Sequence, residues 1–303
     1  MTDVARDRAE LALALGEPGS GKRRYAAAMR LYHQGHLSAE ALEVYRVCAA
    51  RDGDDPALLL RNRGLGGEAG DPGAPQPDAL IGILVDEADG YLATLQGDGI
   101  AEVRRGLAPW RGGAVRIAAP GRNPVVERYL PAALTALAAT HPALAAAIGA
   151  AAPLLDWVTY DLYPPDEIGP AFAAGHAYAS IVGADRAAIP ARDFDLGLFL
   201  IAPDLLYRDH AHPAPELYAP LTGPHGWRFG PGRPLIVKPA HRPVWNPSGQ
   251  PHLTKVGPMP FLCFYGWTRD VDRPAHVVPA DDWARLEAMR IAPDGKISWQ
   301  AEE

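Results

Sequence analysis

Residues 207–218 read YRDHAHPAPELY, and the spacing of their polar side chains indicates a metal site on extended chain. His210, His212, Glu216 and Tyr218 all fall on even positions, and an extended chain sends alternate side chains to one face. Two imidazoles and a carboxylate form a mixed nitrogen and oxygen set that suits Zn²⁺, Fe²⁺ or Mn²⁺. We therefore predict one divalent transition metal ion at these residues, with its identity left open among zinc, iron(II) and manganese.

His252 is the predicted fourth metal ligand. It follows a segment in which Pro247 and Gly249 favour a tight turn, so it is expected to begin a strand and to point inward. A pair of histidines at i and i+2 is by itself more often a solvated strand face, so the prediction depends on the whole set. Pro213 and Pro215 interrupt the strand between HAH and ELY, where we expect a bulge or a sheet edge.

The rest of the chain predicts an α+β protein in two parts. Amphipathic or apolar patterns predict helices over residues 2–15, 23–35, 38–50 and 124–152. The Gly-rich and Pro-rich stretch 62–78 predicts a linker or loop. After Trp157, short apolar runs (LGLFLIA, PLIVKPA and FLCFYGW) are bounded by turn residues, which indicates a sandwich or barrel. We expect a mainly helical N-terminal region over 1–153 and a β-barrel carrying the metal site over 154–303.

The histidine segments resemble the two motifs of the cupin superfamily. The first motif is complete in His210, His212, Glu216 and Gly223, and the second is present as Pro247, Gly249 and His252. This resemblance implies a double-stranded β-helix, or jelly roll, for the C-terminal region. The chain departs from the motifs at three positions. Asp204 and His241 stand where each motif usually opens with glycine, and Val256 replaces the final asparagine; we expect these changes to affect turns more than metal ligation.

Within the cupins, residues 155–270 resemble the dimethylsulfoniopropionate (DMSP) lyase family, most specifically at HAHPAPELY. The resemblance implies β-elimination of DMSP to dimethyl sulfide and acrylate. Carried over by position, Tyr218 matches the tyrosine proposed to remove the α-proton, and Tyr207 matches a second active-site tyrosine. Tyrosine has an ordinary pKa of about 10, so a nearby cation must favour the phenolate.

Aromatic residues near the site are candidates for contact with a sulfonium group. We assign Trp227 and Trp245 to substrate binding, although both are equally compatible with a place in the core. Tyr265 and Trp267 lie on an apolar run and are expected in the core. The cations Arg228, Lys238 and Lys255 are expected to be exposed, as is usual for their type. These cations therefore receive no role in the predicted site.

The composition of the chain limits the kinds of molecule that we expect it to bind. The chain has 303 residues, an apolar fraction of 48% and a net charge of −7 without a basic block, so no nucleic-acid or anionic membrane footprint is visible. Two distant cysteines predict neither disulfides nor a thiolate site. Neither a secretory signal nor a ~20-residue apolar span is evident, so we expect a cytoplasmic protein acting on a small molecule. The helical half has two open roles, capping the barrel or forming the interface of a homodimer.

Residues 16–22, GEPGSGK, match the spacing of a phosphate-binding loop. The preceding segment reads as helix rather than strand, and Arg23 stands where the loop needs a hydroxyl for magnesium. A Gly-rich turn between helices is the better interpretation.

Two other classes of function remain open on the same site. The first is a cupin dioxygenase or isomerase acting on another small carboxylate, since fold and ligands do not fix the reaction. The second is a non-catalytic cupin that binds or senses a ligand, although the acidic N-terminal helices offer no basic recognition helix. Metal identity and oxygen dependence separate the enzyme classes.

Overall fold

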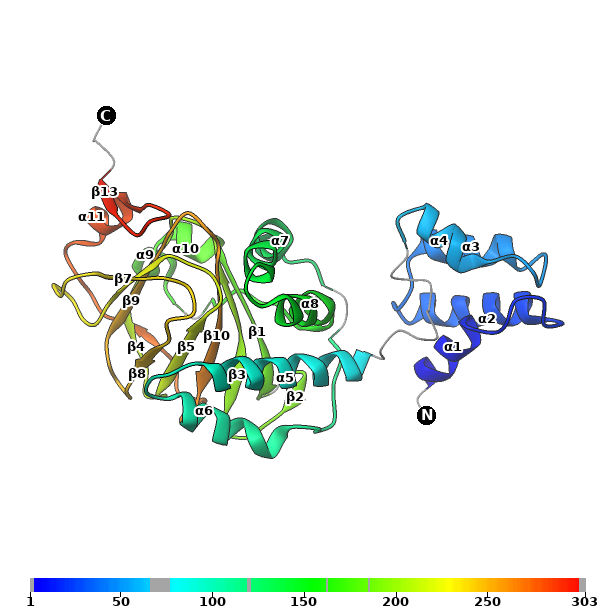
Figure 1. Ribbon diagram of the computed structural model, residues 1–303, viewed down its shortest axis with the longest axis horizontal. Helices are drawn as coiled ribbons and strands as arrows, with labels where there is room; N and C mark the ends of the chain where they lie inside the picture. Colours follow the sequence, from blue (N-terminus) through cyan, green and yellow to red (C-terminus); the bar gives the residue numbers. More distant parts are fainter. Residues whose placement is uncertain (1–2, 66–76, 119–120, 162, 185, 300–303) are drawn as a thin grey trace. The chain divides into compact units, whose positions relative to one another are not determined.

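The computed structural model describes residues 3–65, 77–118, 121–161, 163–184 and 186–299, and it divides into two compact units (Figure 1). The first unit spans residues 1–76 and the second spans 77–303. The first strand begins at His176, and the helices after residue 77 belong to the same unit as the strands. Most of the linker predicted over 62–78 lies outside the described residues.

The first unit is helical, as predicted. Its described helices are α1 (Asp3–Leu11), α2 (Ser20–His33), α3 (Ala39–Cys48) and α4 (Pro56–Asn62). Ser38 caps α3 by accepting a hydrogen bond from the Ala41 amide at 3.1 Å, which satisfies an amide that the helix leaves unpaired. Small and aliphatic side chains from the four helices form one buried cluster, so this unit has a core of its own.

The GEPGSGK segment forms the end of the turn between α1 and α2 and the first three residues of α2. The amides of Gly19 and Gly21, at the start of α2, donate to the two carboxylate oxygens of Asp52, each at 2.8 Å. An internal carboxylate thus occupies the position in which a nucleotide phosphate would accept these bonds. The interpretation as an interhelical turn is confirmed.

The second unit contains helices along one side of a pair of sheets. Its described helices are α5 (Pro77–Thr94), α6 (Ile100–Leu107), α7 (Pro124–Ala138), α8 (Pro142–Ala151), α9 (Pro165–Ile168), α10 (Pro170–Ala174) and α11 (Trp283–Ala288), with short 3₁₀ turns η2 (Ala108–Trp110) and η3 (Ala152–Leu154). Within the segments that the structure describes, none of the helices is long and apolar enough to cross a membrane.

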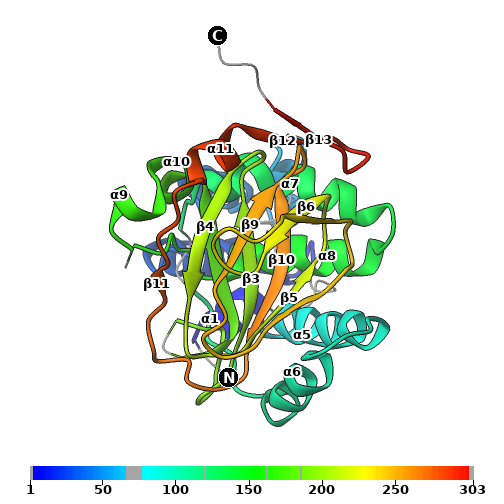
Figure 2. The same cartoon turned by 90° about the vertical axis from the view of Figure 1, so that its left-hand side faces the viewer.

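Most strands form two sheets. The larger has the order β2 (Ile189–Pro190), β1 (His176–Gly183), β3 (Asp195–Ile201), β10 (Phe261–Trp267), β5 (Glu216–Pro220) and β8 (Val244–Asn246). The smaller has the order β11 (His276–Val277), β4 (Leu206–Ala211), β9 (His252–Val256), β6 (His225–Arg228) and β7 (Ile236–Lys238). Figure 2 faces β4, β9 and β6 of the smaller sheet. A separate ladder joins β12 (Met289–Ile291) to β13 (Ile297–Trp299).

The larger sheet is buried on both faces, which explains its continuous apolar runs. In β10, Leu262 and Phe264 belong to the cluster shared with α5–α8, whereas Phe261 and Cys263 belong to the cluster between the two sheets. Alternate residues of a strand point to opposite faces, so both sets must be apolar. Across the described residues no ladder joins the two sheets, so the strands form a pair of facing sheets and the β-barrel expected from the sequence is not confirmed.

The two departures from motif glycines lie at left-handed backbone positions. Asp204 has φ of 62° and His241 has φ of 63°. Each is fixed by its own amide, which donates to the carbonyl of Gly257 and of Pro220, respectively, at 2.9 Å. Short polar side chains tolerate this conformation better than most residues. Both turns therefore keep the left-handed backbone geometry that a glycine at these positions would adopt.

Candidate active site

The four predicted metal ligands come together from three strands. His210 lies near the end of β4, His212 directly follows β4, Glu216 begins β5, and His252 begins β9 as predicted. His210 and His252 are opposite partners in the antiparallel pair β4–β9. We expected a bulge or a sheet edge at residues 212–215, and the structure has neither there. The Pro-containing turn instead carries the chain from the smaller sheet to the larger, so its ligands approach from both.

The three imidazoles are oriented by the backbone. The Nδ1–H of His210, His212 and His252 is positioned to donate to the carbonyl oxygen of Arg208, Ala214 and Gln250 at 2.8, 2.7 and 2.9 Å. These bonds favour the tautomer in which each Nε2 carries a free lone pair. One nitrogen from each ring falls within 4.8 Å of the others, and all three residues are buried.

The donor atoms fit a divalent metal ion. The Nε2 atoms of His210 and His252 are buried and have no hydrogen-bond partner in the described part of the chain. The Oε2 atom of Glu216 lies 3.0 Å from His212 Nε2 and 3.2 Å from His252 Nε2. Buried polar atoms without partners are costly unless a ligand satisfies them. Three nitrogens and one carboxylate oxygen would therefore serve as the protein's share of a zinc, iron or manganese site.

Burial and neighbouring charges shift the pKa values of the predicted ligands, and these shifts bear on metal binding. Burial lowers the pKa of His210 well below its ordinary value, with further lowering by His252 and His212. Burial raises the pKa of Glu216, but His212 and His252 outweigh it and leave the pKa well below the usual range. Burial also lowers the pKa of His212, and the Glu216 carboxylate reverses this to give a raised pKa. The charged Glu216 and the neutral His210 are in the states that metal binding needs, whereas the raised pKa of His212 means that a metal ion must displace a proton there.

The two predicted catalytic tyrosines lie next to the ligands. Tyr218 is buried, two residues after Glu216 on β5, and its ring packs on Trp227 with centroids 4.9 Å apart. Tyr207 stacks on the His210 ring at 3.8 Å, and its hydroxyl lies 2.9 Å from the hydroxyl of Tyr163. Burial raises the pKa of both Tyr218 and Tyr207 well above the ordinary value, and nearby Glu216 raises each further.

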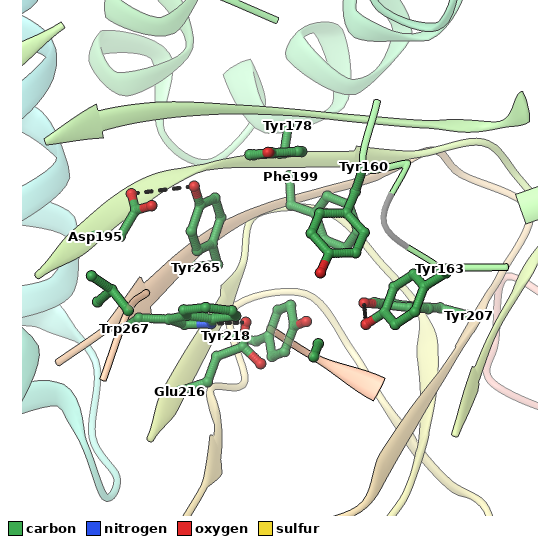
Figure 3. A pocket seen from close by; sticks show the side chains of 12 residues that line it. Tyr160, Tyr163, Tyr178, Asp195, Phe199, Tyr207, Glu216, Tyr218, Tyr265 and Trp267 are labelled. Carbon is green, nitrogen blue, oxygen red and sulfur yellow. Dashed lines mark hydrogen bonds between the residues drawn. The ribbon is translucent and has the colours of Figure 1, made fainter. Parts of the chain in front are cut away.

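A pocket between the sheets borders the metal ligands (Figure 3). Its described lining is mostly aromatic and includes Glu216 and both of the predicted catalytic tyrosines, Tyr207 and Tyr218. The full set is Tyr160, Tyr163, Tyr178, Asp195, Phe199, Tyr207, Glu216, Tyr218, Tyr265, Trp267, Val271 and Ala275. A concave, largely apolar site with a few converging polar groups is the usual form of a small-molecule site.

The structure does not place all of the aromatic residues where the sequence analysis expected them. Trp227 is fully buried behind Tyr218, and Trp245 packs in the helix-side cluster, so neither lines the pocket. A side-chain carbon added at Gly99 would lie 2.0 Å from the Trp245 ring, which shows how closely α6 covers it. Tyr265 belongs to the core cluster between the sheets, as expected, and Trp267 packs against that cluster, but both also line the pocket.

The cations also differ from expectation. Arg228 and Lys255 are buried rather than exposed. The guanidinium of Arg228 forms ion pairs with Asp209 and Asp282, and the ammonium of Lys255 donates to two backbone carbonyls. They stabilise the smaller sheet and α11, and neither of them lines the pocket.

Sequence reasoning missed several lining residues. Tyr160 and Tyr163 precede α9, Tyr178 lies on β1, and Asp195 begins β3. No local sequence pattern distinguishes these residues, because none of them belongs to a recognisable motif. The available signal was the presence of polar or aromatic residues on strands that otherwise read as apolar core.

Trp267 supports the metal site through a hydrogen bond. Its indole Nε1–H donates to Glu216 Oε1 at 2.8 Å, and its ring lies 4.6 Å from the His212 ring. We expect Trp267→Phe to keep the ring contact and lose the bond, because phenylalanine has no donor. Metal affinity should fall about 10- to 100-fold, as for other partners of ligating carboxylates. Competition with a chromogenic chelator measures the metal affinity of the variant. A metal affinity equal to that of wild type would contradict this role of Trp267.

Facing sheets with a buried three-histidine and glutamate cluster define a cupin-type protein with a candidate metal site. The model of the DMSP lyase family matches residues 112–263, half of the chain, and the chain belongs to this family. No curated protein sequence matches.

Two solved structures share the fold. A chain from the structures of the DMSP lyases RdDddP and RnDddQII is 20% identical with a TM-score of 0.52, covering 67% of this chain and 100% of that chain. DMSP lyase DddQ from Ruegeria pomeroyi is 21% identical with a TM-score of 0.50, covering 66% of this chain and 97% of that chain.

Proposed function

We propose that this protein is a metal-dependent lyase that cleaves DMSP to dimethyl sulfide and acrylate by β-elimination. The observation that carries the proposal is the convergence of His210, His212, His252 and Glu216 at one side of a pocket that Tyr218 also lines. Family membership supplies the chemical class. The residues of this chain supply the arrangement of base and ligands that such a reaction needs.

The metal ion, when bound, would act as a Lewis acid that holds the substrate carboxylate and makes the adjacent α-proton more acidic. His210, His212, His252 and Glu216 would hold it. Nitrogen and oxygen donors of this kind accept zinc, iron(II) or manganese.

Tyr218 would act as the general base. Its phenolate takes the α-proton, the electrons of that C–H bond form the double bond of acrylate, and the electrons of the Cβ–S bond leave with sulfur as neutral dimethyl sulfide. In the protein alone, burial and Glu216 hold the Tyr218 pKa above its ordinary value, so the proton stays on the oxygen. A cation at the neighbouring ligands favours the phenolate, which makes the base depend on the metal.

Tyr207 and Tyr163 would close the other side of the site. Their hydroxyl groups are 2.9 Å apart, and stacking of Tyr207 between Phe172 and His210 fixes its ring. This paired hydroxyl would position the substrate carboxylate beside the ligands. The aromatic lining excludes water from the carbanion-like transition state.

Anaerobic incubation with DMSP tests the reaction class. Protein loaded separately with zinc, iron(II) or manganese(II) should release dimethyl sulfide and acrylate in equal amounts, because elimination consumes no oxygen. Oxygen uptake, or a product other than these two, would move the chain to a different class of cupin enzyme.

A further inference from the structure

The pocket has a second acidic group, far from the metal ligands along the sheet. Asp195 lines the pocket from the start of β3. Its carboxylate accepts hydrogen bonds from the hydroxyl of Ser180 at 3.0 Å and from the hydroxyl of Tyr265 at 3.3 Å. The Ser180 and Tyr265 hydroxyls also lie 2.9 Å from each other. Two side chains, from β1 and β10, thus fix the Asp195 carboxylate of β3 at the pocket wall.

The backbone is built to allow this network. Gly197 pairs with both Ser180 and Tyr265, and a side-chain carbon there would lie 2.6 Å from the Tyr265 hydroxyl. Any larger residue at position 197 would displace the Tyr265 ring from its place over β3. The glycine therefore lets the phenol reach across the strand to Asp195.

Among the residues that the structure describes, no lysine, arginine or histidine forms an ion pair with Asp195. The described lining of the pocket contains neither lysine nor arginine, and the partners of the carboxylate are two uncharged hydroxyls. Burial raises the pKa of Asp195 to about 7, although the bonds from Ser180 and Tyr265 oppose this. A buried carboxylate without a counter-ion is costly, and a bound cation would remove that cost.

The surroundings suit an alkylated cation. The rings of Tyr178, Tyr265 and Trp267 line the pocket around Asp195 (Figure 3). Aromatic faces attract poorly hydrated cations, and they also pack against methyl groups. A carboxylate with aromatic neighbours therefore favours a methylated onium group over a small, strongly hydrated ion.

The spacing fits a short zwitterion. Register places Asp195 opposite Trp267 and Trp267 opposite Glu216, so the backbones of the two acidic residues are two strands apart, about 10 Å. The Trp267 ring lies between them (Figure 3). In DMSP two methylene groups separate the carboxylate from the sulfonium, a distance of roughly 4 to 5 Å. The contacts that DMSP would make with the protein at its two ends account for the rest of the separation between Asp195 and Glu216.

We propose that Asp195, held by Ser180 and Tyr265 and flanked by Tyr178 and Trp267, is a cation-binding subsite that selects substrates carrying a methylated onium group. This inference rests on the proposed lyase function for the orientation of the substrate, with the carboxylate at the metal ligands. Asp195 acts in binding, by opposing the positive end of the substrate, and takes no part in proton transfer.

Two ligands of equal size test the subsite in zinc-loaded protein. N,N-dimethyl-β-alanine carries a cationic end at neutral pH, and 4-methylpentanoate replaces that end with an uncharged isopropyl group. Calorimetry at pH 8 should show the cationic ligand binding wild type about tenfold more tightly. Asp195→Asn should remove this preference and leave the affinity for 4-methylpentanoate unchanged.

Asp272→Asn is the matched control, because Asp272 is an exposed carboxylate beside the lining residue Val271. It should keep the preference. Equal affinity of wild type for the two ligands would overturn the subsite even if Asp195→Asn failed to fold. An equal loss of preference in Asp272→Asn would also overturn it, since general charge would then be the cause.

The pH dependence gives a second readout. Below pH about 7 Asp195 gains a proton and its charge is lost, so affinity for the cationic ligand should fall on acidification in wild type. The groups facing Asp195 are Ser180 and Tyr178 from β1 and Tyr265 and Trp267 from β10. Burial raises the pKa of both tyrosines, so neither changes charge near pH 7. A flat ratio between the two ligands from pH 6 to 8 would contradict the proposal.

Failure of the subsite and failure of the lyase are distinguishable. Ligand preference without release of dimethyl sulfide would keep the subsite and reject the reaction. Release of dimethyl sulfide with an unchanged KM in Asp195→Asn would keep the reaction and reject the subsite.

Discussion

His252→Ala is expected to lose its metal ion and, with it, formation of dimethyl sulfide. His252 is fully buried, its Nδ1–H points at the Gln250 carbonyl, and its Nε2 is directed at the ligand cluster. Removing an indirect partner of a metal ligand already costs 10- to 100-fold in affinity, so removing a ligand should cost at least about 100-fold. Metal content after dialysis and release of dimethyl sulfide from DMSP measure the two effects.

His276→Ala is the matched control for this change. His276 is an exposed histidine on β11, paired with Ala211, which lies between His210 and His212 in the sequence. It should keep both the metal and the activity. A His252→Ala protein that retains one metal ion per chain and full activity would contradict the assigned ligand set.

Tyr218→Phe is expected to retain the metal and lose turnover. Phenylalanine preserves the packing on Trp227 and removes only the hydroxyl, so the fold should be unaffected. Loss of a general base lowers kcat by about 10²- to 10⁴-fold, while KM should change little because the aromatic wall remains. Steady-state kinetics on metal-loaded protein separate the two parameters.

Tyr129→Phe controls for the substitution itself. Tyr129 lies on α7, packed against the helix-side cluster and away from the pocket lining. Its variant should match wild type in kcat. If Tyr218→Phe kept kcat within about twofold of wild type, Tyr218 would be a wall residue, and the base would have to be sought elsewhere in the pocket.

The metal ligands could be predicted from sequence because their geometry is local. Alternation along an extended chain places His210 and His212 on one face, and a tight turn places His252 at the start of β9, whereas Glu216 reaches them through the turn between the two sheets. The prolines between the histidines and the glutamate were correctly identified as a break in the strand. The crossing between two sheets was missed, because a break alone does not show which sheet the next strand joins.

The pocket wall could not be predicted because it depends on strand order and register. The order β1-β3-β10-β5 brings Ser180, Asp195 and Tyr265 beside Glu216 from distant parts of the chain. A shift of one residue in register exchanges the two faces of a strand. Trp245 pairs with Leu217, so it faces the helices, whereas Trp267 pairs with Glu216 and faces the pocket.

Removal and return of the metal in wild type tests the account most directly. Chelator-treated protein is dialysed and given DMSP without oxygen, and dimethyl sulfide and acrylate are then followed before and after one equivalent of zinc, iron(II) or manganese(II). The account predicts no products from the treated protein and equal amounts of both after at least one of the metals is restored. Equal product formation before and after restoration, or no product with any metal, would contradict it.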